Sequence, residues 1–505
     1  MRPQIKVAIK YLEIVASSSE KEVERFLKKF LPGTPWEGKI KAVGGYVRDE
    51  FLSILKNDPS IEAKDLDLVV VETKDGADKA THFIYDHFKD EDPHPISEPR
   101  QMGKGYPIWQ ITFKEDITYK GEKYATKGAV IEFADTMKEE YPDPESRQRV
   151  TSPGTLKDDI ERRDFTVNQL LKDMTTGEIE DLTGQSKDDI KNGVLRGHPD
   201  IPLDKTFEED PLRMIRLIRF QAKYDWDIPM SVLRAVKRKA DRITIISSER
   251  IMGELTKIMK LGKLKQAIKL MSATGLLKHV LPEIEALKGI KQNTKWHEEG
   301  DAYKHTLMVL KNAPAGVENQ IAALLHDVGK ASTTKMLEDE IHSYGHEDVG
   351  AEIAEAIMNR LKFDGDTTAR VKKMVQNHMR PHHLGRGAGT KALRKFIRDV
   401  GDELVDSILN LARADELGKI PATNDIPDLI EKIKKIREQS KETITEKTIL
   451  NGKEIMDLLG IPTGTEVGKA KKILTEIEDD YAEKGEELTK EKAREELLKE
   501  FHKRA

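Results

Sequence analysis

Two patterns of hydrophobic positions divide the chain. Between residues 39 and 182, short β-branched or aromatic runs such as "DLDLVVVE" and "GAVIEFAD" are separated by helical or turn-rich stretches, which predicts a small mixed sheet. After residue 200, apolar residues recur at three- and four-residue spacing, as in "NQIAALLHDVGK", which predicts helices almost throughout. We therefore expect an α+β fold, in which an N-terminal helix and a small mixed-sheet head precede a mostly helical body and tail.

Length and composition limit what such a chain can be. A chain of 505 residues exceeds what one hydrophobic core usually organises, so three or four units are expected. No apolar run approaches the roughly 20 residues of a membrane span, and the first residues lack a signal-peptide core, which favours a cytoplasmic protein. Because the sequence has no cysteine, disulfides, thiolate catalysis and cysteine-bound zinc are excluded, and any metal ion needs His, Asp or Glu ligands.

Charge is distributed unevenly along the chain. The formal net charge of -5 argues against a protein that coats nucleic acid indiscriminately. Residues 213–242 nevertheless hold nine Arg or Lys against three Asp, a stretch that can follow a phosphate backbone. The simpler interpretation, a solvated helical face, is the commoner one for charge runs in general.

The segment "DLDL" predicts a metal site in the head. On a strand, Asp65 and Asp67 share one face while Leu66 and Leu68 turn to the core. Two neighbouring carboxylates repel each other unless a cation lies between them. Magnesium, which prefers one or two carboxylates together with substrate phosphate oxygens, fits this need.

Other residues around this segment suit a triphosphate. Gly44 and Gly45 permit close approach of the backbone, and Arg48 follows one helical turn later. Glu132, on another predicted strand, is a third acid that would complete a two-metal site for displacement at phosphorus. Taken alone, a DxD is more often a surface pair and a GG mostly a turn, so the prediction depends on their order and spacing.

The segment "EDPLR" predicts a site that reads a base. Asp210 and Arg213 are three apart and lie on one face if a helix begins here. A carboxylate accepts from an exocyclic amino group and a guanidinium donates to a ring nitrogen or carbonyl, so the pair can admit cytosine and adenine and reject uracil and guanine. The alternative is an intrahelical salt bridge of a few tenths of a kcal/mol.

Histidines concentrate in one segment, since eight of the fourteen fall between residues 297 and 383. His305, His326, Asp327 and Asp415 supply imidazole and carboxylate ligands for one divalent metal ion. His346, His378 and His382 can add a second metal ion or hold phosphate. A metal ion there would activate water against a phosphoester.

Four motifs carry a family resemblance: "GGYVRD", "DLDLVV", "ERRDFTVNQLL" and "EEDPLRMIRLIRF". In this order, over residues 40–285, they resemble the head and neck of the bacterial-type (class II) tRNA nucleotidyltransferase and poly(A) polymerase family. The resemblance implies that Asp65 and Asp67 bind Mg²⁺ and activate the RNA 3′ hydroxyl, and that a loop over residues 139–158 assists the switch from C to A addition. It also implies a set of nucleotide contacts, namely Gly45, Arg48, Arg162, Arg163, Asn168, Asp210, Arg213, Arg216 and Arg219.

"LLHDVGK", the upstream His305 and the downstream Asp415 carry a second resemblance. Through them, residues 295–420 resemble the HD phosphohydrolase domain. This implies a divalent transition metal and phosphatase or 2′,3′-cyclic phosphodiesterase activity; the alternative is an inactive helical domain that positions tRNA.

The combined expectation is a CCA-adding tRNA nucleotidyltransferase that uses CTP and ATP and binds tRNA. The alternatives are a poly(A) polymerase or A-adding enzyme of the same family, and a non-catalytic RNA-binding protein. Four domains are expected: a head over 1–198, a helical neck that binds nucleotide and tRNA over 199–290, the HD domain over 291–425 and a helical tail over 426–505. The glycines of the tail can bring backbone amides to RNA phosphate, and the alternative for this segment is a plain connection between helices.

Overall fold

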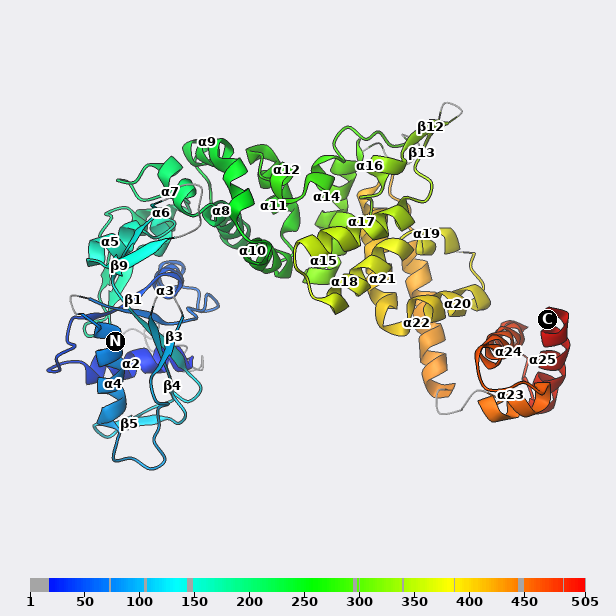
Figure 1. Cartoon of the computed structure of the whole chain (residues 1–505), viewed down its shortest axis with the longest axis horizontal. Helices are drawn as coiled ribbons and strands as arrows, with labels where there is room; N and C mark the ends of the chain where they lie inside the picture. The colour runs from blue at the N-terminus through cyan, green and yellow to red at the C-terminus, as the bar shows by residue number, and fades with distance from the viewer. Residues whose placement is uncertain are drawn as a thin grey trace, which may run out of the picture. The chain divides into compact units, whose positions relative to one another are not determined.

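The computed structural model describes residues 18–504 except for 72–73, 104–106, 143–148, 294–297, 299, 338–339, 386, 444–448 and 485. These residues form two compact units (Figure 1). The first holds the described residues up to Ser247 together with Ala273–Leu276, and the second holds Ser248–Ser272 and the residues from Leu277 onward. None of the described helices is both long and apolar enough to cross a bilayer.

A seven-stranded mixed sheet forms the centre of the first unit, as the sequence pattern predicts. Its strand order is β11-β10-β1-β2-β7-β4-β3, and β2 and β7 are its parallel pair. Strands of a parallel pair begin at the same end of the sheet, so residues at the starts of β2 and β7 become neighbours. The strands are β1 (Ile40–Val43), β2 (Asp67–Val70), β3 (Arg100–Met102), β4 (Ile108–Thr112), β7 (Val130–Asp135), β10 (Leu171–Asp173) and β11 (Ile179–Glu180).

Helices cover this sheet and continue beyond it. α3 packs against β1, while α4 packs against β2, β4 and β7. The expected N-terminal helix is α2, which begins after the N-cap Ser18 and buries Phe26 and Phe30; residues 1–17 lie outside the described part. The helices are α2 (Ser19–Phe30), α3 (Gly45–Lys56), α4 (Gly76–His87), α5 (Leu156–Glu161), α6 (Ser186–Asn192), α7 (Leu203–Glu209), α8 (Leu212–Tyr224) and α9 (Met230–Lys239), with 3-10 turns η1 (Thr166–Asn168) and η2 (Ala240–Ile245).

Two hairpins flank the sheet. The first joins β5 (Ile117–Tyr119) to β6 (Glu122–Tyr124). The second joins β8 (Met137–Glu140) to β9 (Val150–Pro153), which pair antiparallel. The expectation of a loop over 139–158 is therefore wrong at both of its ends, because the range begins inside β8 and its last residues belong to β9 and α5; 143–148 lie outside the described residues.

The second unit is helical, as its period predicts, apart from the hairpin β12–β13 among its described residues. α14, α15, α17, α18 and α21 pack on one another (Figure 1). α22 packs against α21, while α23 to α25 share a separate hydrophobic cluster that includes Ile455, Leu474 and Leu497.

The elements of the second unit are α10 (Ser248–Lys260), α11 (Leu264–Thr274), α12 (Leu277–Val280), α13 (Pro282–Glu285), α14 (Ala302–Asn312), α15 (Val317–Leu325), α16 (Lys330–Thr333), β12 (Lys335–Leu337), β13 (Glu340–His342), α17 (His346–Arg360), α18 (Gly365–Asn377), α19 (Arg380–Leu384), α20 (Thr390–Val400), α21 (Asp402–Gly418), α22 (Ile426–Thr443), α23 (Gly452–Leu459), α24 (Thr465–Lys484) and α25 (Lys490–Arg504).

Candidate functional site

Two carboxylates lie side by side near the start of the parallel strand pair. Asp67 is the first residue of β2, and its register partner on β7 is Glu132. Gln110, on the neighbouring β4, donates from Nε2 to Glu132 Oε1 at 3.1 Å. Asp67 is exposed, yet its pKa is raised to about 6. The main cause is that nearby protein atoms displace water from the carboxylate, followed by repulsion from Glu132 and Asp65. The attraction of Arg163 opposes this shift. Carboxylates that resist ionisation in this way favour a bound cation.

Asp65 lies before the strand rather than in it. β2 begins at Asp67, and Asp65 has a left-handed backbone with φ of 58°. The expectation of one continuous strand through "DLDL" is therefore wrong, although Leu66 and Leu68 are each 1% exposed, as expected. Asp is one of the few residues that tolerate this conformation. The bend still leaves Asp65 close enough to repel the Asp67 carboxylate.

The turn between β1 and α3 lies beside two arginines. Gly44 has φ of 71°, which favours glycine, and a side chain on it would lie 3.5 Å from Arg163 Nη1. A side chain on Gly45 would lie 3.5 Å from Arg48 Nη2. Because α3 begins at Gly45, the N–H groups of its first turn add partial positive charge here. This combination suits a phosphate group.

Arg48 is buried, with only 5% of the residue exposed. Its guanidinium lies over the rings of Phe220 and Tyr224, at 5.2 and 4.9 Å from their centroids. It also donates to the Asp49 carboxylate and to Asn168 Oδ1. Arg48 therefore joins α3 to α8, and its Nη2 atom is the part that lies beside Gly45.

Asp159 holds both arginines of "ERRDFT". Its side chain is fully buried; Oδ1 accepts from Arg162 Nη2 at 2.6 Å and Oδ2 accepts from Arg163 Nη2 at 2.8 Å. Arg162 also donates to Glu139 Oε1 at 3.0 Å. Asp159 was not among the predicted residues, although its position three and four residues ahead of the arginines was an available signal.

Asp164 joins two of the predicted nucleotide-binding segments. Burial favours the neutral form, but Arg216 and Asn168 hold the pKa of Asp164 down to about 2. Arg216 donates to Oδ2 through Nε and Nη2, at 2.8 and 2.7 Å, and Asn168 Nδ2 donates to Oδ1 at 2.7 Å. Arg219 lies over the Phe220 ring, 4.3 Å from its centroid. Sequence analysis also missed Asp164, which stands inside the "ERRDFT" motif.

The pair predicted to read the base does not share one helix. α8 begins at Leu212, and Asp210 has an extended backbone before it. Pro211 explains the difference, because a residue that precedes proline is disfavoured in the helical conformation. Asp210 Oδ1 accepts from Leu212 N at 3.2 Å. Arg213 is 6% exposed and donates to the backbone carbonyl of Arg162.

The second unit brings together all of the residues predicted to bind metal there. Two groups each have ligand atoms within 4.8 Å of one another: His305, His326 and Asp415 form the first, and Asp327, His346 and His378 form the second. His382 joins the first group, because its Nε2 lies 2.8 Å from Asp415 Oδ2.

Backbone carbonyls orient three of these histidines. The Nδ1 atoms of His326, His346 and His378 lie 2.9, 2.8 and 2.6 Å from the carbonyl oxygen three residues earlier. A carbonyl only accepts, so Nδ1 donates and Nε2 of the neutral ring carries a lone pair. His346 Nε2 and His378 Nε2 face each other at 3.3 Å. Two lone pairs at this distance repel. Burial lowers the pKa of His346, but the Asp327 carboxylate raises it above its usual value, so a proton on His346 Nε2 removes the repulsion, as does a metal ion shared by both nitrogen atoms.

Asp327 connects the two groups. Its Oδ1 lies 3.3 Å from His346 Nε2, and its Oδ2 lies 3.2 Å from His326 Nε2. Lys330 Nζ lies 2.7 Å from Asp327 Oδ2, and Lys419 Nζ lies 3.0 Å from Asp415 Oδ2. Neither lysine was predicted, although each follows its carboxylate at helical spacing. The seven predicted residues thus fit one or two divalent metal ions, with two lysines beside the carboxylates.

Gly329 of "HDVGK" lets this segment touch α17. A side chain on it would lie 2.2 Å from the carbonyl oxygen of His346 and 2.8 Å from Gly350 N. We expect Gly329→Ala to lower the thermal midpoint by roughly 5 °C, from about 2 kcal/mol of overpacking. Gly253→Ala is the matched control, because this glycine lies inside α10 with no atom near the added carbon, and alanine is expected to stabilise that helix. Equal midpoints for the two variants would contradict the close approach.

Three segments match known protein families. Residues 40–196 match the poly A polymerase head domain, 226–288 match the "Probable RNA and SrmB- binding site of polymerase A", and 302–417 match the HD domain. A CC-adding tRNA nucleotidyltransferase of Thermus thermophilus is 32% identical over 360 residues, which cover 68% of this chain and 77% of that relative. The chain belongs to the tRNA nucleotidyltransferase and poly(A) polymerase family. The family resemblance inferred from the four motifs is thus confirmed.

Further relatives have CCA, the complete triplet, in their names. A multifunctional CCA protein of Haemophilus influenzae is 27% identical over 438 residues, covering 82% of this chain and 94% of that protein. Among solved structures, the CCA-adding enzyme of Bacillus stearothermophilus with CTP has a TM-score of 0.65 at 19% identity and covers 97% of this chain and 99% of its own. The Thermotoga maritima CCA-adding enzyme with tRNA has a TM-score of 0.56 at 17% identity and covers 97% and 98%. At such identities these likenesses concern the fold, and they confirm the expected fold class.

Proposed function

We propose that the protein adds or repairs the 3′-terminal CCA of tRNA from CTP and ATP, without a nucleic-acid template. The registered pair Asp67 and Glu132, with Gly44 and Arg163 nearby, carries the proposal, because it combines carboxylates suited to a cation with groups suited to a phosphate. The relatives named for CC and CCA addition support the reaction. tRNA is the proposed partner, and the cytoplasm, where these substrates occur, is the proposed location.

Mg²⁺ is the ion proposed for the head. Asp65 and Asp67 would hold it, and Glu132 would complete the acidic set. When bound, the ion would neutralise charge on the triphosphate and lower the pKa of the RNA 3′ hydroxyl. The raised pKa of Asp67 in the free protein supports this assignment, since a cation removes the repulsion that causes part of the shift.

The proposed nucleotide contacts fall into two classes. Gly44, Gly45 and Arg163 would meet the phosphates, and Asp210 with Arg213 would read the Watson–Crick edge of C or A. Arg163 is also bound by Asp159, through Nη2, and it is its Nη1 beside Gly44 that would reach the phosphates. The other proposed contacts are tied to buried carboxylates or rings and would act mainly by holding these groups in place; they are Arg48, Arg162, Asn168, Arg216 and Arg219.

One assay separates this proposal from its rivals. Purified protein is incubated with a tRNA that ends before the CCA, with CTP, ATP or both, and the 3′ ends are sequenced. Ordered addition of C, C and A that stops there supports the proposal. Addition of two C residues without A would make the protein a CC-adding enzyme. Addition of A alone, or of long A tails, would make it an A-adding enzyme or a poly(A) polymerase. If no nucleotide is added, the protein would be an RNA-binding protein.

We also propose that the seven-residue site in the second unit is a phosphohydrolase centre with a divalent transition metal. The Nε2 atoms of His326 and His346, which lie 3.2 and 3.3 Å from Asp327 while Nδ1 of each ring is held by a backbone carbonyl, favour it over a purely structural domain. The proposed domain limits are those expected from the sequence: 1–198, 199–290, 291–425 and 426–505.

A pocket beside this centre supports a nucleotide as the proposed phosphoester. The pocket has a volume of ≈ 400 Å³ and is lined by residues that include Lys330, His346 and Tyr344. Tyr344 is 73% exposed, and its ring stacks on His342 at 4.9 Å with an interplanar angle of 11°. Such an exposed stack suits the base of a nucleotide.

Tyr344→Ala is therefore expected to raise KM for a nucleoside 2′,3′-cyclic phosphate about tenfold, from roughly 1.4 kcal/mol of lost stacking. KM for glycerol 2-phosphate, which has no ring, should stay unchanged. Tyr344→Phe, which keeps the ring, should behave like the wild type in both assays. Equal increases in KM for the two substrates would contradict a base-stacking role.

A further inference from the structure

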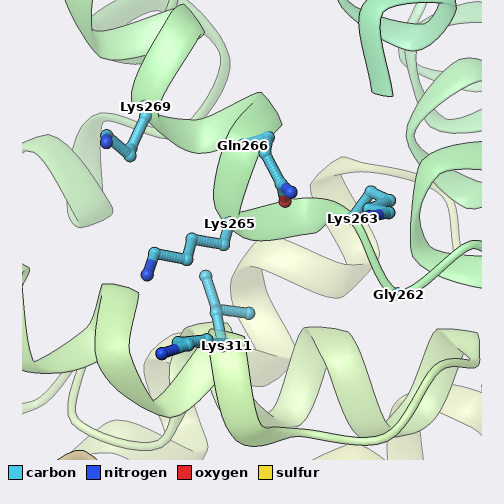
Figure 2. Close-up of a pocket in the computed structure, with 7 residues that line it drawn as sticks. Gly262, Lys263, Lys265, Gln266, Lys269 and Lys311 are labelled. Carbon is cyan, nitrogen blue, oxygen red and sulfur yellow. The ribbon is translucent and has the colours of Figure 1, made fainter. Parts of the chain in front are cut away.

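Three lysine amino groups gather beside one hollow of the second unit. The hollow has a volume of ≈ 350 Å³ and is lined by Gly262, Lys263, Lys265, Gln266, Lys269, Leu310 and Lys311. Figure 2 shows that Lys265 and Lys269, from α11, and Lys311, from α14, extend to the same side of it. These three residues are called the lysine triad below.

The charge of the triad is uncompensated within the described part of the chain. None of its lysines forms an ion pair with a described carboxylate, whereas Lys288 and Lys372 in the same unit do. Burial, followed by repulsion from Lys311 and Lys269, lowers the pKa of Lys265. Like charges four residues apart on a helix are destabilising, and Lys265 and Lys269 have this spacing. The chain has 90 acidic residues, so the lack of a partner here is not a shortage of carboxylates.

The fold holds these lysines together through a rigid connection. Gln320 is fully buried, and its Nε2 donates to the carbonyls of Ala313 and Pro314, both at 3.0 Å. Its Oε1 accepts from Leu264 N, the first residue of α11, at 3.3 Å. One buried amide thus ties the start of α11 to the segment that follows α14. This link fixes the start of α11, where Lys265 lies, relative to the end of α14, where Lys311 lies.

We propose that the lysine triad binds phosphate groups of the RNA backbone of the tRNA substrate, a proposal that rests on the function proposed above. Ammonium groups bind phosphates as point charges and carry no information about the base, which suits an enzyme that has to accept many tRNA sequences. Lys265 and Lys269 lie within the matched segment 226–288, but Lys311 lies in the HD segment 302–417. The RNA contact therefore extends into the first helix of the HD segment.

The test compares two double variants of the full chain that change the net charge equally. Lys265→Gln with Lys311→Gln removes two triad charges, and Lys288→Gln with Lys372→Gln removes two paired lysines elsewhere in the second unit. The Kd for tRNA lacking CCA is measured across a KCl series. We expect the triad variant to bind about tenfold more weakly at 0.1 M KCl and its salt slope to fall by about two, since each phosphate contact adds roughly one to the slope. The control should remain within twofold of the wild type.

Two further readouts separate RNA binding from other roles. The triad variant should show a raised KM for tRNA with unchanged KM values for CTP and ATP, and its thermal midpoint should equal or exceed that of the wild type, because repulsion is relieved. Identical salt slopes in the two double variants would overturn the proposal. Weaker binding of pyrophosphate or CTP without a change for tRNA would also overturn it, and would assign the pocket to free phosphates.

Failure of this proposal is distinguishable from failure of the proposed function. A wild-type protein that extends tRNA while both double variants bind it equally overturns only the role of the triad. A wild-type protein that extends no tRNA, but binds it with a salt slope that depends on the triad, overturns the proposed function and supports the RNA contact.

Discussion

Replacing Asp67 by asparagine is expected to lower the rate of nucleotide addition about a thousandfold or more without lowering stability. The exchange keeps the size of the side chain but removes one of the two carboxylates proposed to hold Mg²⁺, and a loss of this size corresponds to about 4 kcal/mol of transition-state stabilisation. The rate is measured as single-turnover addition of C to a tRNA lacking CCA. In EDTA the thermal midpoint should stay equal or rise, because the exchange removes a charge that Glu132 and Asp65 repel.

The control for this experiment is Asp86→Asn, which changes an exposed carboxylate on α4 in the same unit. It should add nucleotides at the wild-type rate. An Asp67→Asn enzyme that keeps more than a tenth of the wild-type rate would exclude Asp67 as a metal ligand. A loss of activity that comes with a lowered thermal midpoint would instead indicate a structural role.

The general architecture could be predicted because it follows from periodicity. Alternating apolar positions and helical spacing require only local geometry, so the mixed sheet and the helical body were accessible from the sequence. The neighbourhood of Asp67 and Glu132 is different, because it depends on the parallel pairing of β2 with β7. No local pattern encodes that pairing, and Glu132 was joined to the two aspartates only as a third acid on another predicted strand.

Two of the three geometric errors have an identifiable local cause. Placing Asp65 and Asp67 on one face requires an extended backbone at both residues. The left-handed backbone of Asp65 breaks the alternation of faces, and the sequence pattern does not reveal it. The face shared by Asp210 and Arg213 assumed a helix, which Pro211 delays until Leu212. In the second case the signal was present in the sequence, since a residue before proline is a recognised helix boundary.

The buried carboxylates that position the site could not be predicted individually. Asp159 and Asp164 are surrounded by arginines and are as polar in sequence as any surface acid. Their role depends on tertiary burial, since α5 packs on β8 around Asp159 and Arg216 of α8 reaches Asp164 from 52 residues away. The chain has 90 acidic residues, so sequence alone does not distinguish these two.

Replacing Asp327 by asparagine is expected to remove metal from the second unit and to lower its proposed phosphohydrolase rate at least about a hundredfold. Asp327 lies between the two groups of candidate ligands, and asparagine keeps one carbonyl oxygen but loses the negative charge and the second oxygen. Metal content is measured by mass spectrometry on full-length protein dialysed against Mn²⁺. Nucleotide addition should persist, because the carboxylates of the head are unchanged.

The control is Asp366→Asn, an exposed carboxylate in the first turn of α18, the helix that precedes His378. It should retain the wild-type metal content and rate. If Asp327→Asn also retains both, the histidines form a structural polar core and the lone-pair argument is wrong. If the metal is lost but the wild type hydrolyses no phosphoester, the ion is structural, and EDTA should then lower the thermal midpoint of the wild type but not of Asp327→Asn. Hydrolysis by the wild type thus separates a catalytic ion from a structural one, and the two responses to EDTA show whether the ion is bound at Asp327.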